Sequence, residues 1–579
     1  MFSRSFTVFI FALLFSVGLS AQTPSPTVSP TPFAVDKQGV APEKVSPVPA
    51  IAPSFTSNER GLPDLGRVGV DLADQKTMTL NDAIGMALEG NRDIEVTRKN
   101  VLIAEFDLKA ARGVYEPRFA GQTYYERSTV PNVSIFSSNP TTTQGAFAGN
   151  ATLTSYVPGF GTVLTANVNN QRLTSNNPIS PLSPQYNSSL GFSITQPLFR
   201  GRSIDPQRRT IEIAKRNLTL TDAQFRQKAI EIVASVERAY WDLAYTLRNL
   251  QVQRDGVRDA KAQLEHNRRL VDEGQLAPID VVAAETQVAN YEQAVYDALN
   301  LVNVAENNLK NLILPNRNER LWSQAITPVD PVALDVPRVS LEIATETAIN
   351  NRPELQLNDV QKEINDIDRR FYESQRQPQI DLIASYNSSG IGGNANPNFS
   401  SPFCATNPNP AQCQAALLQP ALSNLGGPST VFSDIFSNKY PTYRVGVQFN
   451  LPIFGDRTSR AQLGRALVEG ERIQTQRQAL EQAIQMDVRN ALQVVRTAEA
   501  RLRSASIARE NSAKQYESEQ RKLDSGQSDI YRVLERQTAL TAARSNELRA
   551  QTELNKAIAD LGRATGNSLK ANNVEPKSK

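Results

Sequence analysis

The chain carries the same succession of short motifs twice, in the same order. This duplication constrains the fold more than any other feature, because it means two copies of one unit of roughly 240 residues. Although 579 residues would suffice for several ordinary domains, the repeat favours one duplicated body. A single copy offers no obvious way to bury its faces alone. The echoes are TLNDAIGMALEGNRDI at 79–94 with SLEIATETAINNRPEL at 340–355, QPLFRG at 196–201 with LPIFGD at 451–456, and RRLVDEGQLAPIDVVAAETQ at 268–287 with QRKLDSGQSDIYRVLERQTA at 520–539.

The N-terminus indicates an exported protein. Residues 1–21 combine Arg4, an apolar run, and Ser20 and Ala21 as a cleavage site, which is the pattern of a secretory signal peptide. Residues 22–76 are rich in Pro, Ser and Thr and poor in large apolar side chains, so we expect a disordered leader. The polar residues 567–579 predict a disordered tail.

Charge and hydropathy exclude two classes of protein. The 62 Lys and Arg nearly balance the 59 Asp and Glu, and the charges are interspersed, which argues against nucleic acid as a partner. Beyond the signal there is no apolar run of about 20 residues, so the chain is not a helical membrane protein.

Catalytic and metal-binding patterns are missing from the sequence. There is no Cys-His pair, Walker-type glycine loop or HExxH motif, and His266, the single histidine, reads as a solvated helix residue. We therefore predict no enzyme activity, no cofactor and no metal site. Cys404 and Cys413, close together in a Pro-, Asn- and Gly-rich segment of an exported chain, are expected to form a disulfide.

Apolar residues recur at intervals of three and four over two long segments, 206–273 and 457–524, which predict helices of roughly 100 Å. Shorter helices are expected at 79–113, 279–313, 340–376 and 529–562. Each is about half as long, so two stacked end to end would match one long helix. Such lengths suggest a coiled coil or a tunnel wall.

Alternating apolar and polar residues predict strands at 119–125, 190–194, 380–386 and 443–451. Segments of this kind, about ten residues long, are the signature of a membrane β-barrel wall. The stretches AFAGNATLTSY and GTVLTANVNNQRL, within residues 128–188, could form a further hairpin, either outside the membrane or in the wall. Four strands cannot close a barrel, and an open edge is not tolerated in lipid, so other subunits must complete it. A trimer would give twelve strands.

These features together resemble the outer-membrane efflux proteins, the TolC-like family. The resemblance rests on three pairs of motifs. These are the first residues of each repeat, 79–84 and 340–345, the QPLF and LPIF segments that join strand to helix, and the two turns in which a glycine precedes a valine by seven residues. It implies an α+β fold in which a transmembrane β-barrel, closed in a homotrimer, continues into a long periplasmic helical coiled-coil barrel. The repeats are then residues 77–314 and 340–566, and residues 315–339 form the equatorial segment that belts the helices at mid-height.

The resemblance also places functional residues at the two helix-to-helix turns, where family members close the tunnel and bind periplasmic adaptors. We call residues 272–281 the first tip turn and residues 524–533 the second. Arg532 and Glu535 stand where the family often has aspartate rings, and Arg532 is expected to pair with Asp280 or a neighbouring acid as a latch. The candidate gate and adaptor residues are Asp272, Gly274, Gln275, Asp280, Val281, Asp524, Gly526, Gln527, Asp529, Arg532, Val533 and Glu535.

The function implied is an outer-membrane channel of a tripartite efflux or type I secretion system. Its partners would be two further copies of the chain, a periplasmic adaptor, an inner-membrane pump and outer-membrane lipid. The alternative is an exported coiled-coil scaffold, which explains the long helices but not the strands at matching places. Drug efflux, protein secretion and metal export all stay open as the cargo.

Overall fold

The computed structural model of the protein describes residues 66–131, 140–331, 336, 338–404, 408–451, 456–572 and 574, all within one compact unit, Leu65–Lys579. The expected signal peptide, most of the expected leader and four residues of the second strand-to-helix joint lie outside the described residues. Within them, none of the helices is long and apolar enough to cross a membrane.

Two helices of nearly equal length dominate the fold, α3 (Pro206–Asp272) and α9 (Arg457–Asp524). Each begins at an aspartate N-cap, Asp205 or Asp456, whose side chain accepts a backbone N–H three residues on. The other helices are α1 (Leu80–Gly90), α2 (Arg92–Arg112), α4 (Pro278–Ile313), α5 (Leu341–Asn351), α6 (Pro353–Gln375), α7 (Pro410–Leu422), α8 (Pro428–Phe436), α10 (Ile530–Ala564) and α11 (Ser568–Ala571), with short 3-10 turns η2 (Gly113–Tyr115), η3 (Arg320–Trp322) and η4 (Pro402–Cys404).

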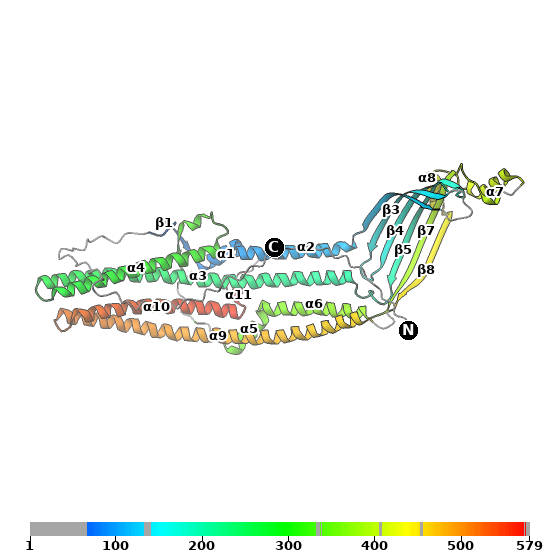
Figure 1. The fold of residues 1–579 in the computed structure, drawn as a ribbon. Coiled ribbons are helices and arrows are strands. Elements are labelled where there is room, and N and C mark those ends of the chain that lie inside the picture. Colours follow the sequence, from blue (N-terminus) through cyan, green and yellow to red (C-terminus); the bar gives the residue numbers. More distant parts are fainter. Residues whose placement is uncertain are drawn as a thin grey trace, which may run out of the picture. The chain divides into compact units, whose positions relative to one another are not determined.

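Short helices follow one another along the long ones, as the sequence predicts. Both α4 and α2 pack against α3, while α10 and α6 pack against both α9 and α3 (Figure 1). The hairpins α3–α4 and α9–α10 end in the first and second tip turns. The four helical rows of one chain therefore form part of a wall.

Two helices predicted as continuous, 79–113 and 340–376, are each broken, and that prediction was wrong. Asn91 leaves the helical conformation (φ −64°, ψ 127°) and caps α2 by accepting the N–H groups of Asp93 and Ile94. At the matching place Arg352 is extended because a residue before proline disfavours the helical region, and Pro353 opens α6.

Each copy has its own buried core. One cluster joins α1, α3 and α4 with the equatorial segment around Tyr240 and Leu309, and a second joins α5, α9 and α10 around Val488 and Leu554. The copies nevertheless cover one another, because α6 and α10 of the second copy pack against α3 of the first. Ion pairs cross between the copies, including Arg209–Asp368 at 2.7 Å and Lys556–Asp242 at 2.9 Å.

Six of the strands in the described residues form one antiparallel sheet, in the order β2-β3-β4-β5-β7-β8. The segments left open by the sequence are wall strands, β3 and β4, inserted between β2 and β5. The sheet therefore has six strands where the sequence indicated four. Their bounds are β2 (Arg118–Pro131), β3 (Thr141–Tyr156), β4 (Val163–Ser175), β5 (Leu182–Pro197), β7 (Gln379–Ala395) and β8 (Tyr440–Asn450).

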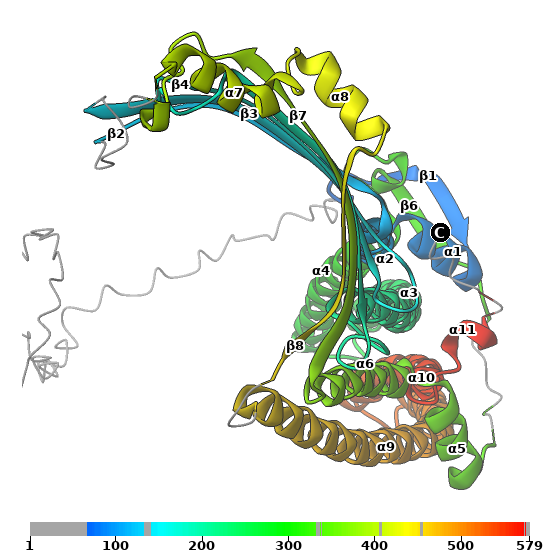
Figure 2. The ribbon, with the colours of Figure 1, turned by 90° about the vertical axis from the view of Figure 1, so that its right-hand side faces the viewer.

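The two faces of the sheet differ in chemistry, and the register shows this directly. Figure 2 shows that the sheet is strongly curved, with α8 on its convex side. One row of directly paired residues runs Phe119, Leu153, Ala166, Phe192, Tyr386 and Tyr443. A row on the opposite face runs Gln122, Asn150, Asn169, Ser189, Ser389 and Tyr440. The sheet is apolar on one side and polar on the other, as expected of a barrel wall.

A buried ionic cluster fixes the equatorial segment to α4. Glu306 accepts from Arg67 at 2.6 Å and from the backbone N–H of Ile326 at 2.6 Å, and Lys310 donates to the carbonyl oxygens of Trp322 and Gln324. The side chains of Glu306 and Lys310 are fully buried, 3.5 Å apart. Desolvation lowers the pKa of Lys310, and the nearby Glu306 carboxylate opposes that shift.

Both ends of the repeat body extend further than predicted. Residues 71–76, placed in the leader, belong to β1 (Asp71–Met78), which pairs in parallel with β6 (Gln324–Pro328). At the other end, α11 lies in the expected tail, where Asn572 donates to Glu237 at 2.8 Å. Both segments have partners in the folded chain, since β1 pairs with the equatorial segment and Asn572 contacts the first copy.

Replacing Glu306 with Gln should destabilise the helical part strongly. The change leaves Arg67 and Lys310 without their buried carboxylate, and breaking a buried charge network by one partner costs about 3–5 kcal/mol. Denaturant midpoints from the helical circular dichroism signal would measure it. Glu510→Gln, in an exposed pair with Lys514, is the control and should leave the midpoint unchanged. Equal midpoints for the two variants would contradict the prediction.

Candidate functional site

The first tip turn reverses the chain between α3 and α4 through a glycine in the left-handed conformation. Gly274 has φ +76°, and the N–H groups of Gly274 and Gln275 donate to the carbonyl oxygens of Val271 (2.9 Å) and Leu270 (2.8 Å). This pair of bonds is the Schellman arrangement that closes a helix C-terminus. Asp272, Gly274 and Gln275 are exposed.

The second tip turn has the same geometry. Gly526 has φ +72°, and the N–H groups of Gly526 and Gln527 donate to the carbonyl oxygens of Leu523 (2.9 Å) and Lys522 (2.8 Å). The repeat noticed in the sequence is therefore a repeat of backbone hydrogen bonding. Val533 is completely buried in a small cluster with Leu523, whereas its counterpart Val281 is only half-buried.

The two turns cap their second helices differently, and this changes the role expected for Arg532. In the first turn, the Asp280 carboxylate accepts the backbone N–H of Ala277 at 3.2 Å. In the second, Asp529 accepts the N–H of Arg532 at 2.9 Å and lies 3.4 Å from its guanidinium. Arg532 thus pairs with an acid of its own helix, and within the chain the pair with Asp280 is not made. Glu535, one turn further along α10, is exposed.

A different contact joins the two hairpins near their tips. Nε2 of His266, on α3, lies 3.4 Å from Oδ1 of Asp524, the last residue of α9. His266 thus lies on a helix and is partly exposed, as expected, and in addition it contacts the other hairpin. Nearby, the Gln287 amide donates to the Thr538 hydroxyl at 2.9 Å, and the hydroxyl oxygens of Tyr291 and Thr541 lie 3.2 Å apart. The apolar residues near each tip form a cluster within one hairpin. The contacts named here between the two hairpins are, in contrast, polar.

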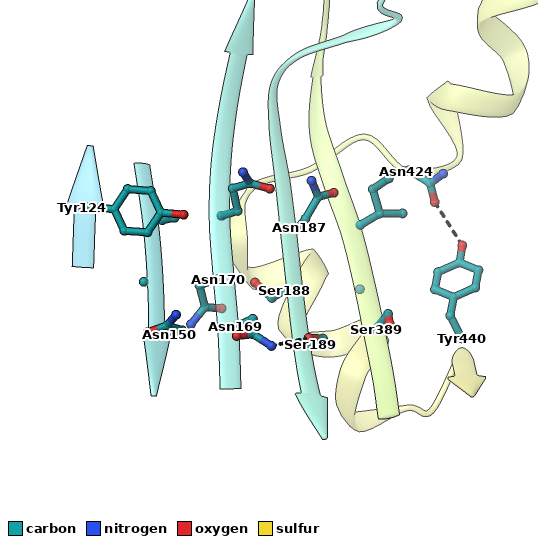
Figure 3. A pocket seen from close by; sticks show the side chains of 15 residues that line it. Tyr124, Asn150, Asn169, Asn170, Asn187, Ser188, Ser189, Ser389, Asn424 and Tyr440 are labelled. Carbon is teal, nitrogen blue, oxygen red and sulfur yellow. Dashed lines mark hydrogen bonds between the residues drawn. The ribbon is translucent and has the colours of Figure 1, made fainter. Parts of the chain in front are cut away.

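The polar face of the sheet is hollowed toward the end far from the helices. The hollow has a volume of about 620 Å³ and is lined by uncharged side chains from β2 through β8 (Figure 3). Asn169 donates to Ser189 at 3.4 Å, and the Tyr440 hydroxyl donates to Asn424 at 3.2 Å. Sequence analysis missed this site because two of its strands were left unassigned, although the alternating polar residues Asn169 and Gln171 of β4 line it.

Comparison with known proteins agrees with this architecture. The outer membrane efflux protein family matches residues 154–313 and 344–567, more than half of the chain and part of both repeats. The chain belongs to the outer membrane efflux protein family. No curated protein matches the chain in sequence.

Solved structures of outer-membrane channels have the same fold as this efflux-family protein. CusC is 14% identical, with a TM-score of 0.60 over 89% of this chain and 95% of that one. The CmeC channel of Campylobacter jejuni is 15% identical, with a TM-score of 0.57 over 84% and 86%. The open-state MtrE channel of Neisseria gonorrhoeae is 16% identical, with a TM-score of 0.55 over 85% and 89%.

Membership of the efflux family also gives the orientation. The protein lies in the outer membrane, with its helical part in the periplasm. The tip turns are then periplasmic, and the segment between β7 and β8 is at the outer end of the sheet. That segment contains the disulfide Cys404–Cys413, with Cα atoms 5.6 Å apart.

Replacing Gly274 or Gly526 with Ala should loosen the tip turns. Neither glycine has an atom within 4 Å of an added Cβ, so the cost is the left-handed backbone alone, about 1–2 kcal/mol for each substitution. Hydrogen exchange of the turn amides would measure it as faster exchange confined to that turn.

Gly464→Ala is the matched control for these substitutions. Gly464 lies inside α9 and also has no atom within 4 Å of an added Cβ. There Ala should stabilise the helix by about 1 kcal/mol. Unchanged exchange in both tip variants would show that the positive φ is not needed.

Proposed function

We propose that the protein is the outer-membrane channel of a tripartite export system, formed by three copies of the chain and acting without catalysis. The observation that carries this proposal is a six-stranded sheet with two chemically opposite faces whose outermost strands, β2 and β8, have a neighbour on one side only. In hydrocarbon such edges must be paired. Pairing β8 of one copy with β2 of the next satisfies both edges and continues the curvature.

A trimeric barrel of this chain would have eighteen strands, six from each copy. The twelve strands expected from the sequence left out β3 and β4. Barrel diameter grows with strand number, and barrels of about this size leave an aqueous channel. The polar row then faces the lumen and the apolar row faces lipid.

The tip turns are the proposed gate and adaptor dock. Each hairpin, α3–α4 and α9–α10, has its own apolar cluster, and polar contacts such as His266–Asp524 join them. Two bodies held together in this way can separate without exposing a shared core. The exposed ends of both turns, including Gln275 and Gln527, are available to a periplasmic adaptor that connects the channel to an inner-membrane pump.

Fractionation and electrophoresis test the channel against the alternative of an exported coiled-coil scaffold. The channel should be recovered in outer membranes and migrate as an oligomer that converts to a monomer on heating. It should also conduct in planar bilayers. Recovery only in soluble periplasmic extract would falsify the channel.

Removing the contact between the hairpins should open the gate more than removing Arg532. His266→Ala abolishes the link to Asp524, so we expect a higher open probability in planar bilayers. Arg532→Ala should leave the open probability unchanged, because its pair with Asp529 lies at one end of a single helix and does not connect the two hairpins. Opening by Arg532→Ala but not by His266→Ala would reverse the assignment and restore the arginine latch.

Charging the lumen should make the channel select cations. The double variant Asn169→Asp, Asn187→Asp adds carboxylates to a lining of uncharged amides and hydroxyls, so the reversal potential in a salt gradient should shift toward that of the cation. Asn318→Asp, on the exposed equatorial segment, is the control. An equal shift in both variants would contradict a lumenal position for Asn169 and Asn187.

A further inference from the structure

The short helix α8 lies against the apolar face of the sheet. Val431 and Ile435 point inward and are buried, and the Ser388 hydroxyl donates to the carbonyl oxygen of Ile435 at 2.8 Å. An added Cβ on Gly390 would lie 2.2 Å from the Val431 carbonyl oxygen, and one on Gly392 would lie 2.9 Å from its side chain. The strand therefore has small residues where the helix packs.

The register shows which face α8 covers. Even-numbered residues of β7 from Leu382 to Tyr386 belong to the apolar face, and Ser388, Gly390 and Gly392 continue the same alternation. Figure 2 accordingly shows α8 on the convex side of the sheet. The helix thus covers the outward face of β7 at Ser388, Gly390 and Gly392.

The outward surface of α8 is apolar. Phe432 is 43% exposed and Phe436 is 80% exposed. The one charged residue of the helix, Asp434, is buried and lies 3.1 Å from Lys439. Phenylalanines on the solvent-facing side of a helix, without charges among them, are typical of a surface that contacts lipid or another protein.

Aromatic side chains of the sheet lie beside the end of this helix. The Tyr386 hydroxyl donates to Asn438, two residues beyond α8, and the Tyr386 ring lies 5.3 Å from that of Tyr443. Tyrosines on the lipid-facing surface mark the membrane interface of outer-membrane barrels. The exposed face of α8 is therefore continuous with the lipid-facing surface at the level of the interface.

We propose that α8 is an interfacial helix that inserts Phe432 and Phe436 into the outer leaflet of the outer membrane. This inference rests on the proposed function, because it takes the apolar face of the sheet as lipid-facing. A lipid occupant is favoured over a second copy of the chain because α8 packs on β7 and β5, inward of the edge strand β8 where a neighbouring copy would pair.

Tryptophan quenching in proteoliposomes of the full chain tests the proposal. The two native tryptophans, Trp241 and Trp322, lie in α3 and η3, outside the sheet, and provide an unquenched background. Phe436→Trp should add emission that phosphatidylcholine brominated near the headgroup quenches more than phosphatidylcholine brominated deep in the chains. An interfacial helix lies about 5–10 Å into the headgroup boundary, which explains this order.

Two matched variants separate the outcomes. Val445→Trp, on the apolar face of β8 and 77% exposed, should be quenched by the deep bromines, and Tyr531→Trp, 74% exposed at the second tip turn, by neither lipid. If Val445→Trp is quenched and Phe436→Trp is not, the helix does not contact lipid, and blue-shifted emission would then indicate a second copy there. If Val445→Trp is also unquenched, the proposed barrel fails, and the placement of α8 fails with it.

Discussion

The fold depends on the pairing of backbone groups at the edges of the sheet. An unpaired N–H or C=O costs several kcal/mol in hydrocarbon, so a six-stranded sheet with two open edges cannot exist alone in a membrane. In the proposed trimer, the chain contributes one part of the barrel wall and two further copies complete it. In that assembly the helical rows would close in the same way, because α3 follows β5 in the chain and α9 follows β8.

Duplication supplies the helices equally but the strands unequally. The first copy contributes β2 to β5, and the second contributes β7 and β8 with α7 and α8 between them. Both copies keep a long helix, a broken helix pair and a Schellman turn. The copies differ where they meet the membrane and its outer side. The periplasmic geometry is thus the repeated part of the structure, and the membrane part is where the copies have diverged.

The sequence predicted the parts whose signal is local. Long apolar periodicity gave α3 and α9, and strict alternation gave β5 and β8. The breaks at Asn91 and Arg352 were missed, although an asparagine cap and a proline after Arg352 are readable signals. The strands β3 and β4 were left open because many of their outward residues are small, such as Ala166, and the apolar signal is weak. The contact between His266 and Asp524 could not be predicted, since it depends on the relative register of α3 and α9.

The inserted pair β3 and β4 has a consequence for how such channels can vary. Two antiparallel strands bring the chain back to the side from which it left, so β5 still enters α3 from the periplasmic end. Arg208, in the first turn of α3, donates to the carbonyl oxygens of Gly201 and Gly159, the latter in the turn between β3 and β4. One strand alone would reverse that direction and separate the joint. The number of strands that each chain contributes can therefore change only in steps of two, that is, by whole hairpins. Such a change would alter the width of the pore and leave the number of helical rows unchanged.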